Sequence, residues 1–361
     1  MSDSGSEPLV SVIMPCRNAG PLLDAALHSV IGQTWPNLEI IFVDNNSSDG
    51  SEARARKIVA TGARPFRCET CTTQGSNHAR IHGYGFARGD YIQWLDADDE
   101  LGPDKLEYEI AVLEQDRQAS IAYCDWLQRD RMTGPGPVDR HFALAQVDDQ
   151  IERALSSVWY PPHCYLVRRG AADVLQMAQA WWPERRIGTD LEYSAVAALL
   201  GLRFRHVPGT SVVHNVWSDR RTSGAATPYV DRVASLQAIY QRLRTIAARP
   251  DIAARITARH RMLLDQDWHI WSVPQDSIDI EDAGSERFQF RHVPSGQVIE
   301  GGRHELIIVQ AMQALGLRQT IGHHALILAA VEPSLNNDVV AIFAMLDRFR
   351  REGLLTAAMA D

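Results

Sequence analysis

Apolar residues in the first 130 positions come in short runs that alternate with longer segments of helical periodicity. Strand-like runs occupy residues 9–16, 38–45, 65–73, 91–98 and 120–127. The segments between them have the spacing of amphipathic helices, each about a dozen residues long. This alternation predicts an α/β domain with a mostly parallel sheet covered by helices on both faces. In such sheets, ligands bind beyond the carboxyl ends of the strands.

Polar side chains collect at those predicted carboxyl ends, in the stretches CRN, DNNSSDG and DADDE. One cleft is therefore expected to gather Asp44, Asp49, Asp96, Asp98 and Asp99. The last three crowd negative charge directly after the apolar run YIQWL, where like charges repel. A bound Mg²⁺ or Mn²⁺ would turn that repulsion into attraction, so the crowding indicates a metal site.

The turn after the first predicted strand lacks a glycine-rich phosphate loop. It reads CRNAGPLLDAAL and contains neither GxGxxG nor GxxxxGK[ST]. A dehydrogenase or a P-loop enzyme is therefore disfavoured. A diphosphate bound here would need another counter-charge, and a divalent cation held by carboxylates is the usual one.

Two long stretches carry a family resemblance. The segments SVIMPCRNAGPLLDAALHSVIGQTWPNLEIIFVDNNSSDGS and GSNHARIHGYGFARGDYIQWLDADDEL resemble the nucleotide-sugar-binding half of family 2 glycosyltransferases with the GT-A fold. The resemblance covers roughly residues 9 to 215. It implies that Asp44 accepts a hydrogen bond from the nucleotide base, usually uracil, and that Pro15 and Arg17 line the same pocket.

The same resemblance implies a donor and metal site. Arg80 is expected near the nucleotide, Asp96 facing the ribose or the metal, and Asp98 binding the metal that bridges the diphosphate. The implied cofactor is Mn²⁺ or Mg²⁺, and the implied donor is a UDP-sugar. The sequence leaves the identity of the sugar open.

The segment IGTDLEYSAVAALLGLRF departs from the family pattern. An acidic pair is expected to open this helix, with an arginine six residues after the second acid, but Thr189 and Val196 stand at the first acidic and the arginine positions. Asp190 lies eleven residues before Gly201, the spacing of the family's catalytic base. The resemblance therefore assigns that role to Asp190, with Glu192 as the alternative, and implies inversion at the anomeric carbon. After HAR, Ile81 replaces the usual asparagine.

Histidines and tryptophans supply further candidates, each with a structural alternative. His214 follows a strand-like run, where some relatives supply a metal ligand, but a lone histidine is often structural. Trp181 and Trp182 precede the predicted base and either shape an acceptor pocket or pack in the core. Trp217 is a candidate to stack on a sugar or to close the core, and His163 is expected next to the ligands rather than among them.

The region after residue 220 has a different pattern. Residues 228–247 and 251–271 have helical apolar spacing and are separated by Pro250. Six arginines cluster on this pair and form either a solvated face or an anion-binding surface. These arginines are Arg242, Arg244, Arg249, Arg255, Arg259 and Arg261.

Beyond residue 275, two short strands joined by a Pro-Ser-Gly turn are predicted in 286–302. Three helices are predicted after them, in 303–316, 320–333 and 337–355. This order and the closing LDRFRREGLL resemble the winged-helix leader-peptide-recognition domain of enzymes that modify ribosomally made peptides. The resemblance implies that a peptide adds as a strand to the sheet edge. An oligomerisation or stabilising appendage is the alternative, and an oligomer is compatible with the sequence.

Composition limits the remaining classes of function. The chain is 45% hydrophobic with a net charge of −9, which disfavours a nucleic-acid polymer as partner. No apolar run approaches the roughly 18 residues of a membrane span, and the start lacks a secretion signal, so a cytoplasmic protein without integral membrane association is expected. The odd cysteine count fits a reducing compartment, and the CxxC of Cys68 and Cys71 has no second pair for zinc.

The sequence thus predicts three parts: a GT-A domain in 1–220, a helical linker in 221–275 and a small α+β winged-helix-like domain in 276–361. The predicted reaction is metal-dependent transfer of a hexose or N-acetylhexosamine from a UDP-sugar to Ser, Thr or Cys of a peptide with a leader segment. Polysaccharide, glycolipid and small-molecule acceptors remain open. A catalytically silent module that binds sugar nucleotide or peptide is the alternative of a different class.

Overall fold

The computed structural model describes residues 7–62, 64–131, 137–156, 158–216, 229–265, 271–272, 278–285, 287–315, 339–352 and 354–357. The chain forms two compact units, Met1–Thr227 and Pro228–Asp361. The three-part division at residues 220 and 275 stays a prediction.

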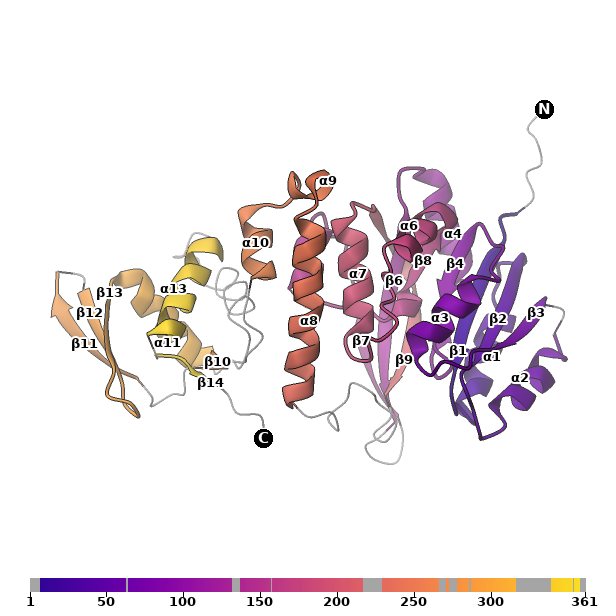
Figure 1. The fold of residues 1–361 in the computed structure, drawn as a ribbon, viewed down its shortest axis with the longest axis horizontal. Helices are drawn as coiled ribbons and strands as arrows, with labels where there is room; N and C mark the ends of the chain where they lie inside the picture. Colours follow the sequence, from indigo (N-terminus) through magenta and orange to yellow (C-terminus); the bar gives the residue numbers. More distant parts are fainter. Residues whose placement is uncertain are drawn as a thin grey trace. The chain divides into compact units, whose positions relative to one another are not determined.

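The first unit is built on one large mixed sheet (Figure 1). Its strand order is β3-β2-β1-β4-β8-β6-β9-β5, and β7 pairs with β6. Strands β3, β2, β1 and β4 are parallel to one another, whereas β8 runs antiparallel to β4 and β6. The strands are β1 (Val10–Cys16), β2 (Leu38–Asp44), β3 (Phe66–Thr70), β4 (Tyr91–Trp94), β5 (Glu100–Leu101), β6 (Ile121–Asp130), β7 (Val138–Phe142), β8 (Tyr165–Arg168) and β9 (Phe204–Val216). The predicted α/β fold is confirmed, with all five predicted strands present.

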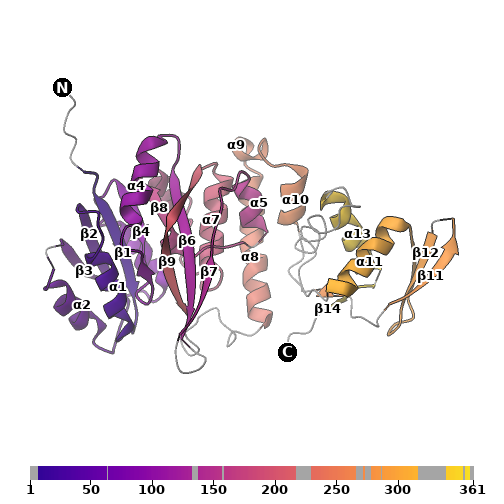
Figure 2. The same cartoon turned by 180° about the vertical axis from the view of Figure 1, so that it is seen from behind.

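Helices cover both faces of the parallel half of the sheet. The helices are α1 (Leu22–Ile31), α2 (Ser51–Val59), α3 (Ser76–Tyr84), α4 (Lys105–Gln115), α5 (Gln150–Leu155), α6 (Arg169–Met177) and α7 (Thr189–Leu199), with a 3-10 turn at Pro162–Cys164. The chain crosses from β1 outward to β3 through α1 and α2 and returns to β4 through α3. Right-handed crossovers therefore put α3 on the opposite face from α1 and α2. Figure 1 shows α3 in front of the sheet, and Figure 2 shows α1 and α2 there.

The carboxyl ends of the parallel strands meet at one edge. Cys16, the last residue of β1, pairs with Asp44, the last residue of β2. Strand β4 ends at Trp94, shorter than the predicted run to residue 98. The chain then turns, with the Asp99 amide donating to the Asp96 carbonyl at 3.1 Å. The acidic residues of this segment therefore belong to a turn, where their side chains are free to point in different directions.

The second unit contains helices and two small sheets. Its elements are α8 (Tyr229–Ala247), α9 (Pro250–Ala253), α10 (Ala258–Leu264), β10 (Trp271–Ser272), β11 (Ile278–Gly284), β12 (Arg287–His292), β13 (Val298–Gly301), α11 (Arg303–Leu315), α13 (Val339–Arg351) and β14 (Thr356–Ala357). The predicted hairpin is confirmed as β12 and β13, and β11 adds a third, antiparallel strand. The predicted helix 320–333 lies outside the described residues.

The prediction of one helix over 251–271 is wrong. Pro250 opens the short helix α9, and a second helix, α10, starts only after Thr257. The Thr257 side chain accepts from the His260 amide, and the His260 ring accepts from the Thr257 amide, which closes a capping box. The capping box at Thr257 therefore starts the separate helix α10 within a segment whose apolar spacing predicted one continuous helix. In the described part of the chain, no helix is both long and apolar enough to cross a bilayer.

Gly83 of α3 tests how closely this helix packs on the sheet. A Cβ placed there would lie 2.7 Å from Ile13 Cγ2 of β1 and 2.8 Å from Val43 Cγ2 of β2. We expect Gly83→Ala to lower the free energy of unfolding by about 1 to 3 kcal/mol because the strands must move apart. Gly170→Ala in α6 is the matched control, since its Cβ would meet nothing within 4 Å. Denaturant titration checks both, and equal stabilities would contradict this packing.

Candidate active site

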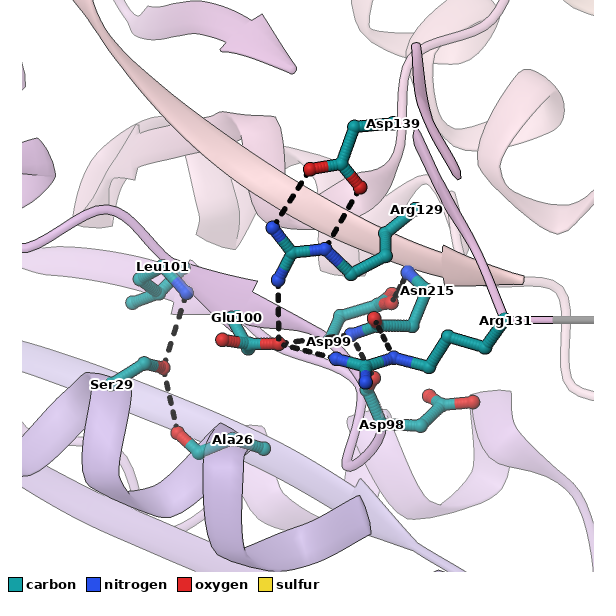
Figure 3. Close-up of polar contacts among 10 residues, drawn as sticks. All are labelled: Ala26, Ser29, Asp98, Asp99, Glu100, Leu101, Arg129, Arg131, Asp139 and Asn215. Atoms are coloured by element: carbon teal, nitrogen blue, oxygen red, sulfur yellow. Dashed lines mark hydrogen bonds and ion pairs between the residues drawn. The ribbon is translucent and has the colours of Figure 1, made fainter. Parts of the chain in front are cut away.

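The acidic turn after β4 is held from behind by Asn215 of β9. The Asn215 amide donates to Asp99 Oδ1 at 2.7 Å, and its side-chain nitrogen donates to the Asp98 carbonyl at 2.8 Å (Figure 3). Asp99 is only 2% exposed, so both contacts lie inside the protein. A residue 116 positions away thus fixes the backbone and one carboxylate of the turn.

A second layer of charged side chains braces Asn215 (Figure 3). The Arg131 Nε donates to Asn215 Oδ1 at 2.7 Å, and its Nη2 lies 3.5 Å from Glu100 Oε1. Arg129 Nη1 lies 4.0 Å from Glu100 Oε1, and the same guanidinium forms a two-point ion pair with Asp139 at 2.9 and 3.0 Å. Strands β6, β7 and β9 are thereby joined to the turn through side chains as well as through the sheet.

Two histidines approach the second oxygen of Asp99. His214 Nδ1 lies 3.1 Å and His163 Nδ1 lies 3.4 Å from Asp99 Oδ2. Burial alone would raise the pKa of Asp99, but His214, His163 and the Asn215 amide outweigh it and hold that pKa below its usual range. Burial lowers the pKa of His163 to about 4, so this ring is neutral. The pKa of His214 is raised instead. Burial lowers this pKa, but the negative charges of Asp99, Asp98 and Asp190 outweigh burial.

Asp98 is the carboxylate with the least favourable surroundings. Burial, then the charges of Asp99 and Asp96, raise the pKa of Asp98 to about 8. An acid whose pKa is raised in this way gains most from a nearby cation. The structure therefore fits the prediction that a metal ion is bound here, although the metal-binding roles of Asp98 and His214 stay predictions.

Asp96 is paired with Arg80, which lies under it. Arg80 Nη2 contacts Asp96 Oδ1 at 2.6 Å, and Nη1 donates to Asn77 Oδ1 at 3.0 Å. The guanidinium stacks over the Trp181 ring at 4.4 Å, and Arg80 is 2% exposed. Arg80 therefore lies behind Asp96 and orients that carboxylate rather than extending into the open edge.

Trp181 belongs to the core. It is 2% exposed and stacks on Tyr193 with ring centroids 4.2 Å apart. Of the two alternatives given by the sequence, packing holds for this residue. Trp182 is half-buried, and its carbonyl accepts from Asn77 Nδ2 at 2.8 Å. Trp217 lies outside the described residues.

Asp44 carries an unsatisfied acceptor at the end of β2. Its Oδ2 accepts from the Ser47 amide at 3.1 Å, whereas its buried Oδ1 has no hydrogen-bond partner within the described structure. Pro15 is buried in the adjacent strand, and Arg17 is exposed just beyond it. Asp49 has another role: it accepts from the Ser51 amide and hydroxyl at 3.0 and 2.6 Å, where α2 begins.

Asp190 lies in the first turn of α7. Gly188, with φ of 73°, precedes the helix, and the Thr189 hydroxyl donates to Asp190 Oδ1 at 3.0 Å. Burial raises the pKa of Asp190 to about 6, against the attraction of Arg80. The alternative base, Glu192, is fully buried and paired with Arg185 at 3.0 Å. Asp190 is therefore the better placed of the two to accept a proton near neutral pH.

An aromatic group beside His214 escaped the sequence reasoning. Trp126 and Phe142 stack with centroids 4.0 Å apart and planes 3° apart. The Trp159 ring lies 5.7 Å from Trp126 and 5.8 Å from His214, yet Trp159 is 39% exposed. Its sequence signal was a tryptophan in the stretch VWYPPHC, where only His163 was named as a candidate.

The cysteines are free thiols. Burial raises the pKa of Cys68 to about 11 and also raises that of Cys71. Neither thiol has the lowered pKa of a redox-active cysteine. The reading of Cys68 and Cys71 as ordinary thiols is consistent with these surroundings.

Comparison with known proteins finds relatives for the part of the chain that contains Asp44 and the acidic turn. Residues 11–175 match the model of glycosyl transferase family 2. An uncharacterized glycosyltransferase of Haemophilus influenzae is 36% identical over 122 residues, 33% of this chain and 49% of the relative. A putative teichuronic acid biosynthesis glycosyltransferase, TuaG of Bacillus subtilis, is 35% identical over 104 residues, 29% of this chain and 41% of the relative. The chain spans about half or less of the length of these curated relatives.

A solved structure also has a fold similar to that of this chain. The structure of residues 1–349 of S. aureus TarS in complex with UDP-GlcNAc superposes with a TM-score of 0.53 and 16% identity, covering 71% of this chain and 70% of that TarS fragment. The predicted GT-A fold is confirmed, and residues 11–175 match the model of the family that the motifs resemble.

The raised pKa of Asp98 has a consequence for stability without metal. Between its ordinary pKa of 3.8 and about 8, the folded state holds more protons at this group than the unfolded state, so its contribution to stability falls as pH rises. We expect Asp98→Asn to raise the melting temperature of the metal-free protein at pH 8. The difference should shrink toward pH 4.

Asp139→Asn is the control, because Asp139 forms an exposed ion pair with Arg129 that lowers its pKa. This variant should bring no stabilisation at pH 8. A lower melting temperature for Asp98→Asn than for the wild type at pH 8 would show that the ionised Asp98 carboxylate does not destabilise the folded protein.

Proposed function

We propose that this protein is an inverting, metal-dependent glycosyltransferase that uses a UDP-sugar donor. The observation that carries the proposal is the acidic edge of the sheet. Asp44 offers an unpartnered buried oxygen there, and Asp98 has a carboxylate whose charge lacks compensation. Asp44 could bind the base of a nucleotide sugar. Asp98 could bind the metal ion at the diphosphate of the same molecule.

The donor base is proposed to bind at Asp44. The imide N–H of uracil is a hydrogen-bond donor, and the free Oδ1 of Asp44 is an acceptor at a carboxyl strand end. Leaving that oxygen unpaired costs about 1 to 3 kcal/mol, which base binding would recover. The complex of TarS with UDP-GlcNAc supports this choice of nucleotide for the fold.

The donor diphosphate is proposed to bind at the acidic turn. Asp98 and His214 would hold a Mn²⁺ or Mg²⁺ ion there, and Asp96, oriented by Arg80, would face the ribose or the metal. When bound, the ion supplies positive charge to the departing diphosphate. Asp99 takes no part in this contact, since its oxygens already face Asn215 and the two histidines.

Asp190 is proposed as the general base. Its carboxylate takes the proton of the acceptor hydroxyl or thiol while the acceptor atom bonds to the anomeric carbon. The bond from that carbon to the diphosphate oxygen breaks, and UDP leaves with the electron pair. Because the acceptor attacks opposite the leaving group, a single displacement inverts the configuration.

The acceptor is proposed to be Ser, Thr or Cys of a ribosomally made peptide that the second unit recruits. In the described part of that unit, β11 and β13 flank β12, and a peptide would add as a further strand at the edge of this sheet. The order of β12, β13, α11 and α13 supports a winged-helix-like domain.

A carbohydrate acceptor is the second candidate, and Trp159 favours it. An exposed indole beside His214 offers a flat apolar surface on which the C–H face of a sugar ring can pack. A silent binding module is the third candidate, because Thr189 and Val196 replace expected functional residues. Metal-dependent UDP binding without hydrolysis or transfer would support it.

The role of Asp190 is tested by Asp190→Asn. We expect turnover to fall about 10²- to 10⁴-fold, because general-base catalysis contributes that much, while UDP affinity is retained. Wild-type turnover should fall as pH drops below about 6, where the Asp190 carboxylate gains a proton. Product formation followed by mass spectrometry and UDP binding by calorimetry check the two effects.

The control variant is Asp173→Asn, which alters a carboxylate that accepts from the exposed Tyr84 hydroxyl. It should leave turnover within about twofold. Near-normal turnover of Asp190→Asn would show that another group acts as the general base.

The acceptor class is tested by Trp159→Ala with a panel of peptides and oligosaccharides. If a sugar ring packs on Trp159, KM for the glycan should rise roughly 3- to 10-fold, with hydrolysis of the UDP-sugar unchanged. Trp159→Phe should retain most of the affinity. Met177→Ala, which removes another exposed apolar side chain, is the control. Transfer to a peptide with unchanged KM in Trp159→Ala would reject the carbohydrate acceptor.

A further inference from the structure

Asp99, His163 and His214 bring three ligand atoms together behind the acidic turn. One oxygen or nitrogen from each lies within 4.8 Å of the other two. Asp99 Oδ2 is 3.1 Å from His214 Nδ1 and 3.4 Å from His163 Nδ1. Ligands about 2.1 Å from one metal ion stand roughly 3 to 3.5 Å from each other. The three side chains therefore have the spacing of a metal site without needing to move far.

His163 adds an independent observation. Its side chain is fully buried, and neither ring nitrogen has a hydrogen-bond partner in the described structure. A neutral imidazole carries one donor and one acceptor, and each buried group left unpaired costs about 1 to 3 kcal/mol. The Asp99 carboxylate approaches one nitrogen, at 3.4 Å. A ligand atom is thus held beside the other two with no other bond to satisfy it.

The residues around the group fix its members in place. The Asn215 amide occupies Asp99 Oδ1 and leaves Oδ2 to face the histidines. The His163 carbonyl accepts from the buried Gln93 Nε2 at 3.0 Å, which anchors the 3-10 turn that carries the ring. Such outer contacts orient ligands in metal sites. The His214 side chain is 23% exposed and offers the entry path.

We propose that Asp99, His163 and His214 form a cation site that fills without the sugar nucleotide and prefers Zn²⁺, Co²⁺ or Mn²⁺ to Mg²⁺. Two imidazole nitrogens and one carboxylate oxygen suit first-row transition ions, whereas Mg²⁺ requires oxygen ligands and keeps its waters. The site shares His214 with the proposed donor metal site but uses Asp99 and His163, whereas the donor site contains Asp98 and depends on the diphosphate. The two sites exclude each other at His214, so this one is occupied in the absence of the nucleotide. Its existence does not rest on the proposed transfer reaction.

Titration of untagged, chelator-treated protein with Co²⁺ in the absence of nucleotide tests the proposal. We expect about one equivalent to bind, with visible absorption of nitrogen-ligated Co²⁺, and an approximately 100-fold excess of Mg²⁺ to leave it bound. His163→Gln should weaken Co²⁺ binding at least tenfold. No Co²⁺ binding before UDP is added, or full displacement by Mg²⁺, would overturn the proposal.

His206→Gln is the matched control. His206 also contacts a carboxylate, with its Nε2 2.8 Å from Asp125 Oδ1, but it lies outside the three-residue group. Its Co²⁺ affinity should equal that of the wild type, and an unchanged affinity in His163→Gln would reject His163 as a ligand. If His163→Gln does not fold, the wild-type Co²⁺ spectrum and Mg²⁺ competition decide the question. UDP binding and sugar transfer are measured separately, so the proposed function can fail while the metal site stands.

Discussion

The arrangement of this domain depends on how three adjacent carboxylates are kept together at the end of one buried strand. Asp96 is neutralised by the buried Arg80, and Asp99 receives the Asn215 amide and two histidines. Asp98 has the remaining charge, and its pKa is raised by burial and by its neighbours. Asp96 and Asp99 thus have partners within the protein, whereas Asp98 is left in a state that a cation would improve.

The sheet explains why these groups meet. Strands β1, β2 and β4 end at the same edge, which brings Asp44 near the acidic turn although 52 residues separate it from Asp96. Helix α7 then presents Asp190, whose pKa responds to Arg80 and Asp96. The diphosphate-binding and proton-accepting groups of the proposed function therefore come from different elements but share one electrostatic environment, and Asp44 lies at the same edge of the sheet.

Much of this could be predicted from local pattern, and the remainder could not. The five strands and the acidic cluster follow from apolar periodicity, because alternating strands and helices leave polar residues at strand ends. The end of β4 at Trp94 was missed because an apolar run does not show where a turn begins. Partners distant in the chain, such as Asn215 for Asp99 and Trp181 for Arg80, have no local signal. The division of residues 251–271 into two helices was not predicted, because the apolar spacing continues through Thr257, where the capping box starts a new helix.

The central claim is that the acidic turn binds the diphosphate of a nucleotide through a divalent cation. Calorimetric titration of the protein with UDP, in Mn²⁺ and then in excess chelator, tests it most directly. The account predicts that UDP affinity falls at least about tenfold without the cation, since the acidic turn then has no positive charge to bind the diphosphate. Equal affinity in both conditions would contradict it.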